Sequence, residues 1–510
     1  MLSKIQCRLH FYFIFEKNPM ITLQRYPEKF KLFIFSFAIS IICYGYALVN
    51  FTVAIDGENP IYPDFAMSLG RWGLNFIRYK LLGSYTPYFT LIAALVFMSL
   101  SAVEICRILK LRGIKSYLFC SLFLTFPQLA YQLVFLVQAE AVGLAFLLNV
   151  YSYSLFLLAY DKKNKYTKLL LFALSAILIT FALSIYQALI FVPVVLCLLQ
   201  MLINSELSSF SFKDKFKKNI VFAIILAIGR GLYFLSVDLL CPPVQGSYLS
   251  TYVAGESENK FIAFYKLWIE LIKGKMFYGN KLFFISTLLF GVLILKYAIN
   301  RKMFFLKFGI IVVLMVLPFT ISYFITNGYH PPRLYMSMGI VFAIPFILLI
   351  NRVKTSDIPI AITFVISLIN IYFVTELYNS QSKIVAQDVN NAKTILSKIN
   401  AKYPEIDLSK TPIYFHGSIT GEFYDKFTLP QSEIFSGSFL KWDNGNNYRI
   451  QSFYNYMGIA SLQITNQAGY AKIKEKITPL PIWPSSNSIE LIDGIMVVKL
   501  GANEGSPLPN

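Results

Sequence analysis

The feature that most constrains this chain is a series of apolar stretches, each long enough to cross a bilayer, separated by short basic clusters. About 20 apolar residues in a helix cross the ~30 Å hydrocarbon core of a membrane. A helix fits because it satisfies its backbone hydrogen bonds internally. The 510 residues are 56% apolar and only 14% charged, whereas soluble domains carry roughly 25% charged residues. The composition therefore argues against a large soluble helical protein.

The apolar stretches predict about eleven transmembrane helices. They are expected at about residues 32–54, 85–106, 116–136, 141–160, two within 169–203, 220–240, 282–299, one ending near 326, one ending near 350, and 358–377.

The basic clusters between these stretches fall on one side of the predicted membrane, which the positive-inside rule assigns to the cytoplasm. This predicts a cytoplasmic segment at 1–31 and a transmembrane domain at 32–378, with external loops at 55–84 and 241–281. An odd number of spans then puts residues 379–510 outside. The expected location is a bacterial inner membrane, so this outside is the periplasm. The net charge of +19 is interpreted as topology signals and lipid contacts rather than nucleic-acid binding.

The segment after residue 378 is polar and has no spanning stretch. An amphipathic pattern predicts a helix at 387–402. Strands are predicted at 412–415 and within 488–500, the latter folded back at Asp493-Gly494, a strong hairpin signal. The predicted fold class is therefore an α-helical polytopic membrane protein with a small C-terminal α/β domain. Apolar residues at helical spacing further predict a helix lying along the membrane surface at 63–82.

No pattern in the sequence predicts a metal or another cofactor. The six cysteines lie mostly in or beside apolar stretches, and no pair has metal-ligand spacing. His330 and His416 are far apart in sequence, and neither has other potential metal ligands at a suitable spacing. A glycine-rich nucleotide-binding loop is also absent from the sequence.

Three acidic residues follow the first predicted span: Asp56, Glu58 and Asp64. A carboxylate at the membrane surface can act as a general base, because partial burial raises its pKa toward neutrality. The alternative is an ordinary solvated loop.

Three arginines are candidates for binding phosphate, whose oxygens suit the planar guanidinium. Arg71 and Arg333 are predicted at the outer surface, where they could instead be interfacial anchors. Arg230 lies within a predicted span, where a charge is costly and usually functional or paired. Tyr186 and Gln187, at a predicted outer turn, could bind sugar hydroxyls or simply cap the turn.

These motifs, taken in order, resemble the phage-type Gtr glucosyltransferases that decorate bacterial O-antigen, and the resemblance covers most of the chain. The motifs that carry it are the span ending in Asp56, Gly70-Arg71-Trp72, Pro87, Ser184-Ile185-Tyr186-Gln187-Ala188, Pro332-Arg333, and the run from Ile482-Trp483-Pro484 through Asp493-Gly494 to Val497-Val498-Lys499-Leu500.

The resemblance implies a membrane glycosyltransferase similar in plan to the GT-C enzymes. It implies glucose transfer, with inversion, from undecaprenyl-phosphate-glucose to the lipid-linked O-antigen repeat of lipopolysaccharide, the reaction of serotype conversion. Asp56 would be the catalytic carboxylate, although many members carry an Asp-Asp pair here, so that Glu58 could have the role.

The resemblance also implies further site residues. Arg71 and Arg333 would hold the donor phosphate. The candidates for substrate binding are Asp64, Trp72, Tyr186, Gln187, Arg230 and His330.

Two other functions remain open. A flippase or transporter of a lipid-linked sugar is expected to show internal repeats and broken helices at the midplane, whereas most polar residues here lie at the predicted outer rim. An O-antigen polymerase is the other alternative.

Overall fold

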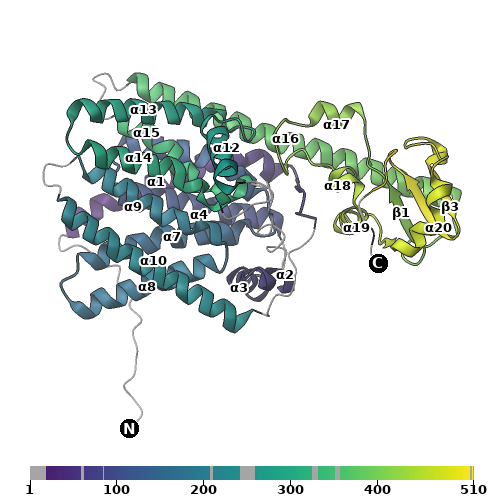
Figure 1. The fold of residues 1–510 in the computed structure, drawn as a ribbon, viewed down its shortest axis with the longest axis horizontal. Helices are drawn as coiled ribbons and strands as arrows, with labels where there is room; N and C mark the ends of the chain where they lie inside the picture. Colours follow the sequence, from purple (N-terminus) through teal and green to yellow (C-terminus); the bar gives the residue numbers. More distant parts are fainter. Residues whose placement is uncertain are drawn as a thin grey trace, which may run out of the picture.

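The computed structural model describes residues 19–58, 63–83, 86–206, 211–241, 259–323, 331–350, 357–505 and 508. It consists of a helical bundle joined by one long helix to a smaller domain that contains a four-stranded sheet (Figure 1). The long elements of the bundle are α1 (Pro19–Val49), α4 (Pro87–Ile108), α5 (Ile114–Thr125), α7 (Ala139–Tyr160), α8 (Lys165–Leu183), α9 (Phe191–Asn204), α10 (Phe212–Leu240), α12 (Lys260–Ile272), α13 (Phe283–Asn300), α14 (Phe304–Val316), α15 (Met338–Ile350) and α16 (Asp357–Lys402).

Short helices connect these elements. They are α2 (Pro63–Ser68), α3 (Trp72–Asn75), the π-helix η1 (Phe76–Leu81), α6 (Ala130–Leu133), and the 3₁₀ segments η2 (Pro127–Leu129), η3 (Gln187–Ile190), η4 (Asn280–Leu282), η5 (Leu317–Tyr323) and η6 (Pro332–Tyr335).

Within the described part of the chain, nine helices are long and apolar enough to cross a membrane. Two shorter apolar helices, α5 and α15, occupy the positions of the third and tenth predicted spans. The predicted polytopic helical fold is therefore confirmed, with the third span shorter than predicted. The third span ends at Thr125 because Pro127 follows, and proline cannot continue the backbone hydrogen bonding of a helix.

The predicted surface helix at 63–82 is also not one helix. The chain breaks after α2, where Gly70 adopts φ +69° and an added Cβ would lie 2.8 Å from the Tyr233 hydroxyl. Only glycine tolerates that combination easily. The segment instead forms α2, α3 and η1 in succession.

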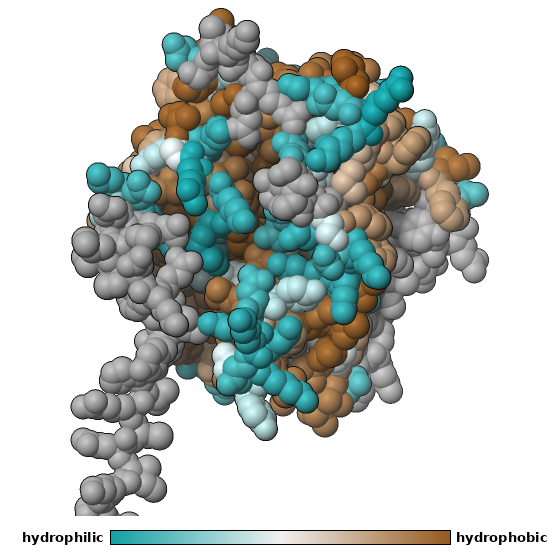
Figure 2. Space-filling view, turned by 90° about the vertical axis from the view of Figure 1, so that its left-hand side faces the viewer, coloured by the Kyte–Doolittle hydropathy of each residue, from teal (hydrophilic) through white to brown (hydrophobic). Residues whose placement is uncertain are grey.

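Burial within the bundle separates a central layer from an outer one. All but one residue of α15 are buried, and Phe342 stacks on Phe126 with ring centroids 4.3 Å apart. In contrast, α10 and α13 expose many large apolar side chains, as lipid contact requires. The end of the bundle that points away from the smaller domain carries many hydrophilic side chains (Figure 2).

The helix α16 joins the bundle to the smaller domain. Its 46 residues correspond to a length of about 69 Å at 1.5 Å per residue. It runs without a break through residue 378, where the composition of the sequence changes, and reaches the sheet domain (Figure 1).

The smaller domain contains β1 (Pro412–His416), β2 (Gln463–Ile464), β3 (Ile489–Ile492) and β4 (Ile495–Lys499) in the order β2-β1-β4-β3. β1 is parallel to β2 and β4, and β3 is antiparallel to β4. The predicted strands and the hairpin are confirmed: Asp493 and Gly494 both have positive φ, 48° and 78°, as a type I′ turn requires. The helical elements of this domain are α17 (Glu422–Phe427), α18 (Trp442–Gly445), α19 (Asn447–Tyr456), α20 (Gln467–Ile477) and η7 (Ser486–Ser488).

A stretch of the smaller domain, residues 428–441, packs between α16 and the bundle; we call it the docking loop. The Gln381 amide on α16 donates to the Val53 carbonyl at 2.8 Å and accepts from the Gly437 N–H at 3.2 Å. A Cβ on Gly437 would lie 2.3 Å from the Ile55 side chain. The docking loop therefore lies directly against the chain that leaves α1.

Candidate active site

The chain that leaves α1 presents two carboxylates in one tight turn. The Gly57 N–H donates to the Ala54 carbonyl at 2.8 Å, and Asp56 adopts φ +70°. This turn leaves the Asp56 side chain 47% exposed, whereas the Glu58 side chain is buried. The two predicted catalytic residues thus lie side by side in different environments.

Both carboxylates bind one guanidinium, that of Arg449 on α19 of the smaller domain. Its Nη2 lies 3.2 Å from Asp56 and 2.8 Å from Asp443, and its Nη1 donates to Glu58. The Arg449 side chain is only 13% exposed. One cation therefore holds three carboxylates and ties the smaller domain to the first loop.

Burial dominates the electrostatics of Glu58. It raises the pKa of this carboxyl to about 7, although the Arg449 guanidinium favours the charged form. A carboxyl with such a pKa can accept or give up a proton near neutral pH. Perturbed groups of this kind are common at functional sites.

A second cluster forms around Tyr186, where the chain turns between α8 and α9. The Arg71 guanidinium lies 5.0 Å from the centre of the Tyr186 ring, and its Nε donates to the Gln187 side chain at 3.3 Å. Gln187 in turn donates to the Leu69 carbonyl at 2.8 Å and to the Tyr233 hydroxyl at 2.9 Å. The Gln187 amide thereby fixes the backbone just before Arg71.

Arg333, on η6, also contacts Tyr186, through its backbone. The Tyr186 hydroxyl donates to the Arg333 carbonyl at 3.5 Å. The Arg333 guanidinium lies 4.8 Å from the centre of the Phe135 ring and pairs with Glu433 of the docking loop at 3.6 Å. Arg71 and Arg333, about 260 residues apart in sequence, therefore both contact one tyrosine.

The remaining predicted site residues lie elsewhere or outside the described residues. The Trp72 indole donates to Ser236 at 2.9 Å and packs on Phe181. Arg230 is exposed on α10, with its guanidinium 5.4 Å from the Phe234 ring centre. The Asp64 side chain and all of His330 lie outside the described residues.

Sequence reasoning missed Arg449, Asp443 and Glu433. They lie in a polar segment that carries no motif, and nothing local distinguishes them from the other charged residues of that segment. The buried ion pair between Arg78 on η1 and Glu140 at the start of α7, 2.6 Å long, was missed because its partners are 62 positions apart in the chain.

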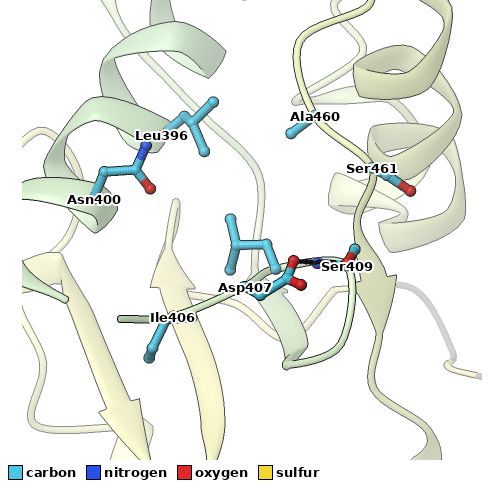
Figure 3. A pocket seen from close by; sticks show the side chains of 8 residues that line it. Leu396, Asn400, Ile406, Asp407, Ser409, Ala460 and Ser461 are labelled. Carbon is cyan, nitrogen blue, oxygen red and sulfur yellow. Dashed lines mark hydrogen bonds between the residues drawn. The ribbon is translucent and has the colours of Figure 1, made fainter. Parts of the chain in front are cut away.

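A small open pocket lies in the smaller domain. Side chains from the end of α16, the loop after it and the chain after α19 line it (Figure 3). The Asp407 carboxylate accepts from the Ser409 N–H at 2.9 Å and from its hydroxyl at 2.6 Å. Residues lining the pocket are Leu396, Asn400, Ile406, Asp407, Leu408, Ser409, Ala460 and Ser461.

Among the residues that the structure describes, no three His, Cys, Asp or Glu side chains are arranged to hold a metal ion. The three carboxylates around residue 449 instead share the guanidinium.

Comparison with protein families gives one match, to the glucosyl transferase GtrII family, over residues 45–242. No curated protein and no solved structure matches the chain. The matched part includes Asp56, Arg71 and Tyr186 and ends before Arg333 and Arg449. Over residues 45–242, which carry most of the predicted site, this chain is thus a match to the GtrII glucosyl transferases, in agreement with the resemblance that its motifs predict.

Proposed function

We propose that this protein transfers glucose from undecaprenyl-phosphate-glucose to the lipid-linked O-antigen repeat of lipopolysaccharide, at the periplasmic face of the inner membrane. The family match supports glucosyl transfer. The observation that carries the proposal is the smaller domain's contact with both clusters: it contributes Glu433 beside Arg333 and Arg449 between Asp56 and Glu58. A carboxylate site and a two-arginine site are the two elements that such a transfer needs.

The reaction is a direct displacement at the anomeric carbon. The acceptor hydroxyl oxygen forms the new bond to that carbon, and its proton passes to a carboxylate, Asp56 or alternatively Glu58. The bond from the anomeric carbon to the donor phosphate breaks, and its electron pair stays on the phosphate oxygen. Arg71 and Arg333 stabilise the charge that grows there. A single displacement inverts the anomeric configuration.

The pocket beside Asp407 is the candidate site for sugars of the acceptor. Its lining combines hydroxyl, amide and carboxylate groups with apolar side chains, the mixture that suits a carbohydrate.

A transfer assay distinguishes this function from its alternatives. Membranes that contain the protein receive polyprenyl-phosphate-glucose labelled in the sugar, together with a lipid-linked repeat. We expect label in the repeat. Movement of the labelled lipid across the membrane without transfer would favour a flippase, and longer glycan chains without label would favour a polymerase. Either of these results contradicts the proposal.

The proposed topology has the basic ends of the helices in the cytoplasm. Arg107 lies in the last turn of α4, and Lys165 and Lys213 lie in the first turns of α8 and α10. The opposite ends of the helices lead to Asp56, Tyr186 and the smaller domain. We expect a reporter fused after Leu500 to be active only in the periplasm, with one fused within the 161–164 turn as the cytoplasmic control. A cytoplasmic signal after Leu500 would overturn this topology.

Substituting the two clustered arginines is expected to weaken transfer strongly. Arg71→Gln or Arg333→Gln removes a cation from the proposed phosphate site, and losing one such group typically lowers the rate about 10²-fold or more. Arg71→Lys should restore only part of the rate, because lysine lacks the planar fork. The measurement is the rate of glucose transfer at matched expression.

Lys80→Gln is the control, because it removes an exposed cation from the same segment. If both arginine variants transfer glucose as fast as Lys80→Gln, the arginines are only interfacial anchors.

A further inference from the structure

The link between α5 and α7 is an irregular segment buried in the bundle. Every residue from 126 to 138 is buried, yet the backbone forms only η2, α6 and turns. Because α5 has 12 residues, it covers about 18 Å, well short of a ~30 Å hydrocarbon core. The segment that follows α5 therefore begins at the depth of the hydrocarbon core, enclosed by other parts of the protein. Non-helical backbone occurs at that depth only inside protein or beside a polar cavity.

Three glutamines in this segment are incompletely hydrogen bonded. Gln132 is fully buried, and within the described part of the chain neither its Oε1 nor its Nε2 has a hydrogen-bond partner. Gln128 donates to the Pro332 carbonyl at 2.5 Å, but its Oε1 has no partner among the described residues, and the same holds for the Gln138 Oε1. Most buried side-chain polar atoms are paired, so an amide with both ends unmatched indicates a polar occupant.

The position of Gln132 indicates what that occupant is. Two residues, one on either side of Gln132 in the chain, contact η6: Gln128 donates to the Pro332 carbonyl, and the Phe135 ring centre lies 4.8 Å from the Arg333 guanidinium. Gln132 lies on α6, which packs against η6, the segment that carries the arginine assigned to the donor phosphate. In a hexose 1-phosphate the nearest hydroxyl is on the ring carbon next to the one that carries the phosphate. A group beside the phosphate site can therefore reach a hydroxyl of the sugar.

We propose that Gln132 binds the sugar of the donor, with its amide N–H donating to one hydroxyl and its carbonyl accepting from another. The ligand class is a hexose carried on a polyprenyl phosphate, and this assignment rests on the proposed function. A primary amide supplies one donor and one acceptor side by side. Buried groups that hydrogen bond a substrate hydroxyl reject analogues that lack it. Gln132 is thus a specificity residue for the donor sugar.

The test compares Gln132→Met, which keeps the shape but removes the amide, with Asn149→Leu. Asn149 is also fully buried with an unpartnered oxygen, but it lies in the middle of α7 and donates to the Ala145 carbonyl. Purified protein is titrated with polyprenyl-phosphate-glucose and with polyprenyl phosphate that lacks the sugar. For Gln132→Met we expect affinity for the glucose lipid to fall about tenfold or more, as for lost hydrogen bonds in a buried site, with affinity for the bare lipid phosphate unchanged. Asn149→Leu should leave both affinities unchanged.

The outcomes separate this inference from the proposed function. If Gln132→Met binds the glucose lipid as the unaltered protein does, the amide holds only water and the inference fails, while transfer by the unaltered protein still supports the function. If the unaltered protein binds neither lipid and transfers no glucose, the proposed function itself fails. A variant that loses affinity for both lipids equally would assign Gln132 to packing and overturn the sugar-binding role.

Discussion

The Asp56→Asn variant is expected to lose glucose transfer by ~10²–10⁴-fold, the range typical of removing a general base. A sugar hydroxyl is a poor nucleophile until its proton is being removed, and an amide cannot accept that proton. The fold should persist, because the side chains have nearly the same shape and Asp56 is about half exposed. The measurement is glucosylation of the O-antigen repeat at matched expression.

Glu58→Gln is expected to have a smaller effect, and Asp64→Asn a smaller effect again. The reverse order, with Glu58→Gln inactive and Asp56→Asn active, would move the catalytic role to Glu58. The pH profile then provides a second check. Because burial raises the pKa of Glu58 to about 7, a Glu58 base would be protonated and inactive below that value, and the rate would rise with pH through it.

Arg449→Met should be almost as damaging, with a loss of transfer of about 10²-fold or more, because the buried Glu58 would lose its counter-charge. Removing one partner of a buried ion pair typically costs about 3–5 kcal/mol. Repulsion between Asp56 and Glu58 would then disturb the position of the proposed base and loosen the contact with the smaller domain. Arg449→Lys should recover part of the activity, since it keeps the charge but cannot bridge three carboxylates.

Lys441→Met is the matched control, because Lys441 in the same domain pairs only loosely with Asp425, at 4.0 Å, and both side chains are exposed. Hydrogen exchange of the docking loop accompanies the activity measurement. Full transfer by Arg449→Met would exclude a positioning role for the guanidinium. Lost transfer with an unchanged docking loop would assign the effect to the carboxylates themselves rather than to a detached domain.

These two substitutions are sharper tests than removal of the smaller domain. Truncation at Gln381 would cut α16 and remove the amide that binds the Val53 carbonyl beside the proposed active site. Lost activity in that truncation would therefore not distinguish acceptor recognition from a damaged first loop.

Most of the fold could be predicted because it is encoded locally. Span length and the Asp493-Gly494 turn depend on residues that are neighbours in the chain. The errors arose where one residue interrupts a long pattern: Pro127 ends the third span early, and Gly70 divides the predicted surface helix. Hydropathy averages over such single residues and cannot detect them.

The candidate site also contains residues that a local motif identifies and residues that only the fold brings together. Arg71, Tyr186 and Gln187 are in contact with one another, and each could be selected from a short motif. Arg449 could not, because its partners Asp56 and Glu58 are about 390 residues away, and ion pairs across such distances leave no period or spacing in one sequence. Gln132 was hidden for another reason: a glutamine within an apolar stretch reads as part of a span until the backbone shows that the helix has already ended.

The separation of Asp56 and Arg449 also has a consequence for how the protein is made. They are 393 positions apart, so at synthesis rates of ~5–20 residues per second Arg449 emerges about 20–80 s after Asp56. During that interval the first loop exists without its guanidinium, and no nascent chain has a complete carboxylate site. Ribosomes that stall before residue 449 would leave a first loop whose two carboxylates lack the guanidinium that binds them in the complete chain.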